Sequence, residues 1–101
     1  MKIGIVSRTD REDALELDRN IIEYLIESKV KIEVDIDVAE KLVEYEKFKT
    51  PIENMTSDFV ICVGGDGTVL KAQHILSPKK IPILRNHARY QLRYTRIGPP
   101  L

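Results

Sequence analysis

The sequence has few of the features that mark secreted, membrane-spanning or disordered proteins. Its single cysteine, Cys62, has no disulfide partner and lies in an apolar run, so we expect it to pack as a small hydrophobic residue. No run approaches the roughly 18 apolar residues that a membrane-spanning helix needs. No signal-peptide pattern precedes the first apolar stretch. We therefore expect a cytoplasmic protein that does not associate with membranes.

The chain also lacks an excess of either charge, since its formal net charge is +0. All 16 acidic residues lie before residue 85, whereas residues 85–101 carry four arginines and no acid. An acidic body argues against a nucleic-acid binder, because such proteins usually present a basic surface. The arginines and tyrosines at 89, 90, 93 and 94 would suit RNA, but we interpret 85–101 as a loosely packed, divergent basic tail. The 101 residues then form one small domain, 1–84, followed by this tail.

Apolar residues recur with the periods of alternating strands and helices. Buried strands are predicted at 2–7, 59–63 and 81–84, and strict alternation of apolar and charged residues predicts a strand with one solvated face at 30–38, near a sheet edge. Helical spacing predicts helices that end near residue 28, at 39–48, and from about 68 to 76. The first of these has Leu17, Ile21, Tyr24 and Leu25 as its apolar face and Asp10 or Asp13 as its cap. Together these patterns predict an α/β fold, a Rossmann-like parallel sheet with flanking helices.

The segment Gly64-Gly65-Asp66-Gly67-Thr68 lies between a predicted buried strand and a helix, where parallel sheets bind ligands. Glycines let phosphate oxygens approach the main chain, and a helix start offers free N–H donors. Asp66 would repel a phosphate, but its carboxylate can accept a hydrogen bond from a sugar hydroxyl and take its proton. Gly-Gly and Asp-Gly also form plain hairpin turns. The helical spacing that follows this turn favours the functional interpretation.

Other common signatures of chemistry are missing. The chain has neither a Gly-x-x-x-x-Gly-Lys-Ser/Thr loop nor a Gly-x-Gly-x-x-Gly fingerprint. His74 and His87 have no second ligand at metal-binding spacing, so the sequence predicts no metal ligands. Arg8 follows the first strand and could reach a phosphate, but we leave it outside the predicted site because a solvated loop arginine is more common.

Residues 59–72, which read FVICVGGDGTVLKA, closely resemble the first motif of NAD kinases, a strand that ends in GGDGT and is followed by an aliphatic pair and a basic residue. Diacylglycerol and sphingosine kinases share GGDGT but typically continue with an Asn-Glu pair, and phosphofructokinases carry a similar turn. The continuation Val69-Leu70-Lys71-Ala72 favours the NAD kinases. A lipid or sugar kinase of the same superfamily is the alternative, as is a non-catalytic nucleotide-binding fragment.

The resemblance implies phosphorylation of the adenosine 2′-hydroxyl of NAD to give NADP, with ATP or polyphosphate as donor and a divalent metal, Mg²⁺, accompanying it. Asp66 would accept the proton; Gly67 and Lys71 would join Asp66 in contacting NAD; and Gly64, Gly65 and Thr68 would line the phosphate region. After Leu84 the chain departs from the glycine-rich second motif of the family and is much shorter than its members. We therefore expect a truncated or altered N-terminal domain that is inactive alone, with homo-oligomers possible once the second domain is restored.

Overall fold

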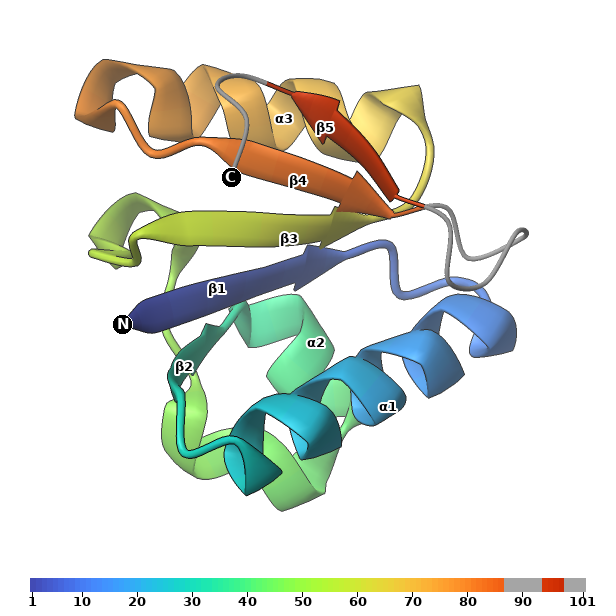
Figure 1. Cartoon of the computed structure of the whole chain (residues 1–101). Coiled ribbons are helices and arrows are strands. Elements are labelled where there is room, and N and C mark those ends of the chain that lie inside the picture. The colour runs from blue at the N-terminus through green and yellow to red at the C-terminus, as the bar shows by residue number, and fades with distance from the viewer. Residues whose placement is uncertain (87–93, 98–101) are drawn as a thin grey trace.

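The computed structural model of the chain describes residues 1–86 and, as backbone, 94–97. Its elements follow in order along the chain (Figure 1): β1 Lys2–Ser7, α1 Glu12–Glu27, β2 Lys31–Val34, α2 Ile36–Lys41, the 3₁₀ turns η1 Val43–Phe48 and η2 Ile52–Asn54, β3 Phe59–Val63, α3 Asp66–Leu76, the 3₁₀ turn η3 Ser77–Lys79, β4 Ile83–Asn86 and β5 Tyr94–Ile97. No helix in these ranges is long and apolar enough to cross a membrane.

The strands form one sheet in the order β2-β1-β3-β4-β5. The first four are parallel, and β5 pairs antiparallel with β4. Helices α1 and α2 cover one face and α3 covers the other (Figure 1). The predicted α/β fold with a parallel sheet and flanking helices is therefore confirmed, and the carboxyl ends of β1 to β4 meet at one edge.

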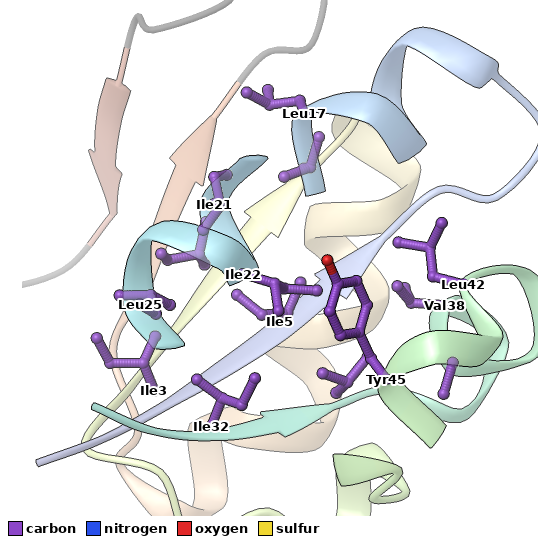
Figure 2. Close-up of a cluster of buried hydrophobic side chains, with 14 of the residues drawn as sticks. Ile3, Ile5, Leu17, Ile21, Ile22, Leu25, Ile32, Val38, Leu42 and Tyr45 are labelled. Carbon is purple, nitrogen blue, oxygen red and sulfur yellow. The ribbon is translucent and has the colours of Figure 1, made fainter. Parts of the chain in front are cut away.

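Alternate residues of the strands supply two separate cores. On the α1 and α2 face, Figure 2 shows Ile3, Ile5 and Ile32 of the sheet packed against helix residues such as Ile22. The opposite face packs Val60 and Cys62, among others, against α3. Burial raises the pKa of the Cys62 thiol to about 12, so this cysteine is a buried, protonated side chain. The predicted structural role of Cys62 is confirmed.

The prediction for residues 30–48 is wrong in two respects. The strand is β2, which ends at Val34, and α2 begins at Ile36. Buried Val38, Ala39, Leu42 and Tyr45 recur at helical spacing, so the apolar residues that suggested alternation also match a helix face. The expected solvated face is absent because Glu33 is buried, its carboxylate accepting hydrogen bonds from Thr56 N at 2.9 Å and Ser57 Oγ at 2.6 Å.

The first helix and the fourth strand also differ from the prediction. Helix α1 begins after Arg11 without a side-chain cap, and Tyr24 is 69% exposed instead of facing the core. Strand β4 lies two residues later than 81–84, because Pro82 has no N–H to give to a ladder and Lys80 turns through a left-handed conformation with φ 59°. The interpretation of His87, Arg89, Tyr90 and Arg93 concerns residues outside the described ranges, whereas 94–97 form β5.

Candidate functional site

The turn between β3 and α3 lies at the carboxyl end of β3, which is the central strand of the sheet. Its first residue, Gly64, has φ 147°, a conformation that side chains rarely adopt. A Cβ at this position would lie 3.0 Å from Thr68 Oγ1 and 3.4 Å from Arg8 Cβ. Gly64 is therefore required by the backbone and by the close approach of its neighbours. Gly65, in contrast, has φ −87°, which residues with side chains also adopt.

Gly65 and Gly67 leave room beside the main chain. A Cβ built on either one would meet nothing within 4 Å. Helix α3 begins at Asp66, two residues earlier than predicted, and its first internal hydrogen bond runs from Val69 N to the Gly65 carbonyl at 3.2 Å. The amides of residues 66–68 consequently have no acceptor within the helix. Open space and free N–H groups at a helix start suit an anion.

Asp66 occupies the first helical position and points away from the core. Its side chain is 83% exposed, and its Oδ1 lies 2.8 Å from Nη1 of Arg85 on β4. The Arg85 side chain is 17% exposed, and its buried Nε has no hydrogen-bond partner among the described residues. The ion pair fixes the direction of an accessible carboxylate. Sequence reasoning missed Arg85 because it assigned this residue to the tail.

Thr68 and Lys71 lie on the opposite flank of α3. With Gly67 they line a cleft of about 290 Å³ at the carboxyl ends of β1 and β2. The remaining wall consists of Val6, Ser7, Arg8, Thr9, Asp10, Asp35, Asp37 and Ile52. The predicted site residues therefore share one turn but face two ways, with Asp66 toward β4 and the Thr68–Lys71 side toward β1 and β2.

Charges of both signs line this cleft. Arg8 Nε and Nη2 donate to the two Asp10 oxygens at 2.8 and 2.9 Å, and this pairing lowers the pKa of Asp10 to about 2. Burial and then Asp37 raise the pKa of Asp35, while the Ile36 N–H and Lys71 act in the opposite direction. Sequence reasoning left out Arg8, although its position after the first strand was visible. It missed Asp35 because it placed this residue inside a strand.

Two further polar side chains are buried, that of Asp18 on α1 and that of Asn86 at the end of β4. Asp18 and Asn86 are both 0% exposed, and their side-chain oxygens and the Asn86 amide nitrogen have no hydrogen-bond partner among the described residues. Burial raises the pKa of Asp18 to about 8; the nearby Ser7 hydroxyl opposes the rise only in part, and donates to the Arg8 carbonyl at 3.0 Å. Among the described residues, no three His, Cys, Asp or Glu side chains could together hold a metal ion.

Comparisons with known proteins identify the family of this chain. A family model of the ATP-NAD kinase N-terminal domain matches residues 3–85. The chain is 56% identical over 84 residues to an NAD kinase of Methanosphaera stadtmanae, 41% identical over 85 residues to one of Pyrococcus furiosus, and 36% identical over 84 residues to one of Methanothermobacter thermautotrophicus. Each match covers 83% of this chain and 30% of the relative's length. The chain belongs to the NAD kinase family, in which it matches the N-terminal domain.

Proposed function

We propose that this chain is the part of an NAD kinase that aligns the acceptor hydroxyl with the donor phosphate, in the ATP-dependent phosphorylation of the adenosine 2′-hydroxyl of NAD. The observation that carries the proposal is the accessible Asp66 carboxylate at the start of α3, beside free main-chain N–H groups. The helix start stabilises the Asp66 carboxylate itself, but this negative charge would repel a phosphate bound beside it, and a role toward a reacting hydroxyl explains why an acid is found there. The names of the relatives, all NAD kinases, support the same reaction.

In the proposed reaction, Asp66 accepts a hydrogen bond from the ribose hydroxyl and orients its oxygen toward the terminal phosphorus of the donor. As the new O–P bond forms and the bond to the leaving ADP breaks, the hydroxyl proton passes to the Asp66 carboxylate. The free amides of residues 66–68 stabilise negative charge on the transferred group. Arg85 holds the Asp66 carboxylate in one direction through their 2.8 Å ion pair.

The remaining predicted residues have supporting roles in this proposal. Gly64 shapes the turn, Gly65 and Gly67 admit phosphate oxygens to the backbone, and Thr68 and Lys71 contact the nucleotide phosphates. The resemblance also implies Mg²⁺. The described residues offer no cluster of metal ligands, so the ion would be held by the donor's phosphates.

The test uses a chimera in which this chain replaces the matching segment of the Methanosphaera stadtmanae NAD kinase, to which it is 56% identical. We expect the chimera to form NADP from NAD with ATP or polyphosphate, and to leave diacylglycerol, sphingosine and fructose 6-phosphate unmodified. The 101-residue chain alone should be at least about 100-fold slower, because its Asp66 side chain is 83% exposed and phosphoryl transfer depends on positioning.

Three results would contradict this account. Phosphorylation of a lipid or sugar in preference to NAD would assign the chain to another branch of the superfamily. Equal rates for the chimera and the chain alone would show that this domain needs no further groups to hold NAD. Binding of NAD and ATP by a folded chimera without turnover would favour a non-catalytic nucleotide-binding role.

A further inference from the structure

The cleft at the ends of β1 and β2 lies away from the proposed proton acceptor. Asp66 does not line it, because its side chain pairs with Arg85 of β4, and β4 lies on the other side of β3 from β1. The start of α3 stands between the two places, since Gly67, Thr68 and Lys71 line the cleft. A ligand that passes across this helix start would therefore meet Asp66 at one end and the cleft at the other.

Asp35 is the unusual member of the cleft wall. It follows β2 directly, its N–H donates to the Ile5 carbonyl at 2.9 Å, and the residue is only 7% exposed although it lines the cleft. Within residues 1–86, no side chain donates a hydrogen bond or forms an ion pair to its carboxylate. The Ile36 N–H donates to this carboxylate, which keeps acceptor capacity for a donor that enters the cleft.

The rest of the wall narrows the chemistry of that donor. Asp37, close enough to raise the pKa of Asp35, adds a second carboxylate. Lys71, which is close enough to lower the pKa of Asp35, and the free amides of α3 supply positive charge, and Val6 and Ile52 add apolar surface. The matching ligand presents both hydroxyl donors and a phosphate. An acid has this role in dinucleotide-binding folds with a Gly-x-Gly-x-x-Gly turn, a turn that this chain lacks, where it accepts a hydrogen bond from a ribose of NAD.

We propose that this cleft is a ribose subsite for the phosphate donor, in which Asp35 accepts hydrogen bonds from the vicinal hydroxyls of a nucleoside triphosphate. The proposal rests on the proposed function, because Asp66 takes the acceptor hydroxyl on the β4 flank and the transferred phosphate lies at the turn between them. The donor nucleoside then extends toward β1 and β2. Lys71, which the family resemblance assigns to NAD, would contact the donor phosphates instead. A volume of about 290 Å³ is at the low end for small-ligand cavities and suits a ribose with part of its phosphate chain.

The test measures binding to the 101-residue chain by calorimetry, with ATP, 2′,3′-dideoxy-ATP and tripolyphosphate, each with and without Mg²⁺. We expect ATP to bind at least about tenfold more tightly than dideoxy-ATP, since a charge-assisted hydrogen bond is lost. This comparison needs no variant, so it does not depend on the folding of a mutant.

One variant and one control variant test whether Asp35 is the residue that binds the ribose hydroxyls. Asp35→Asn keeps the side-chain volume and a good residue at the start of α2, and it should weaken ATP binding about tenfold and change dideoxy-ATP binding less than twofold. Its tripolyphosphate affinity should stay level or rise, because a negative charge has been removed. Glu40→Gln makes the same change in charge at an exposed α2 position outside the cleft, and it should leave all three affinities unchanged.

The proposal is overturned if ATP and dideoxy-ATP bind equally, if no ATP binding is detected, or if Asp35→Asn weakens both nucleotides to the same extent. Equal weakening that appears only with Mg²⁺ would identify Asp35 as a contact of the metal–phosphate complex. These outcomes are separable from failure of the proposed function. If the chimera forms NADP but the chain binds ATP and dideoxy-ATP equally, only the ribose subsite is contradicted. If the chain binds ATP more tightly than dideoxy-ATP but the chimera forms no NADP, only the proposed activity is contradicted.

Discussion

Gly64 and Gly65, the two glycines before α3, meet different demands although they are adjacent in the sequence. Gly64 has φ 147° and has Thr68 Oγ1 only 3.0 Å from its Cβ position, so it is required by the fold. Gly65 has φ −87° and empty space beside it, so a side chain there is compatible with the backbone. The residue type alone predicts neither the φ angle nor the free space at each glycine. It follows that substitutions at the two positions should fail in different assays.

We predict that Gly65→Val changes the free energy of unfolding by about 1 kcal/mol or less but lowers the affinity of the chain for ATP, because the branched side chain fills the approach to the free amides. Gly64→Ala should instead destabilise the chain by about 1–3 kcal/mol. Urea titrations and calorimetry measure both quantities. Unchanged ATP affinity in Gly65→Val would remove the support for a phosphate-binding turn.

Asp18 makes the stability of the chain depend on pH. Burial raises its pKa to about 8 in the folded state, whereas the unfolded side chain has its ordinary value of 3.8. Below a pH of about 3.8, Asp18 is protonated in both the folded and the unfolded state, so its burial does not make stability depend on pH. As the pH rises from about 4 through about 8, folding must keep a proton that the unfolded chain has released, so stability falls by up to about 1.4 kcal/mol per pH unit.

Asp18→Asn removes this titration and nearly conserves the shape of the side chain. At pH 8 we expect the free energy of unfolding, from urea titrations, to be more than about 1 kcal/mol higher for the variant than for the original sequence. This difference should shrink toward pH 4. Glu40→Gln, which makes the same change in charge at an exposed α2 position, serves as the matched control. A stability difference that is the same at pH 4 and pH 8 would show that Asp18 does not titrate within this range.

At the scale of elements, the sequence predicts best where one structure alone fits the pattern. The bounds of β1 and β3 agree with the prediction because continuous apolar runs bounded by polar residues or glycine fit buried strands. The segment from β2 to η1 was mispredicted because its apolar residues satisfy both the period of a strand and the period of a helix. Tertiary contacts, above all the burial of Glu33, decide between the two.

Glu33 joins β2 to the loop before β3 through hydrogen bonds from Thr56 N and Ser57 Oγ. We predict that Glu33→Ala destabilises the chain by about 1–3 kcal/mol, because it leaves the buried Ser57 hydroxyl and the part-buried Thr56 amide without their acceptor. Lys31→Ala, at an exposed position of the same strand, should change stability by less than about 0.5 kcal/mol. Equal effects of the two substitutions in urea unfolding would show that the buried contact contributes nothing particular.

For the whole molecule, the parallel sheet brings together residues that no local pattern connects. The GGDGT turn could be found from the sequence because it is contiguous, and its glycines and acid carry a recognisable chemistry. Asp35 and Arg85 could not be found, since the first lies 31 positions before Asp66 and the second 19 after it in the printed numbering. Only the order β2-β1-β3-β4 places one on each flank of α3.

The central claim is that Asp66 receives the proton of the hydroxyl that is phosphorylated. It is tested most directly by measuring the rate of NADP formation for the chimera with and without Asp66→Asn, beside the Glu40→Gln control. We predict that Asp66→Asn lowers turnover by about 10²- to 10⁴-fold, with an unchanged far-ultraviolet circular dichroism spectrum and unchanged ATP affinity within about threefold. Near-normal NADP formation by a folded Asp66→Asn chimera would contradict the account.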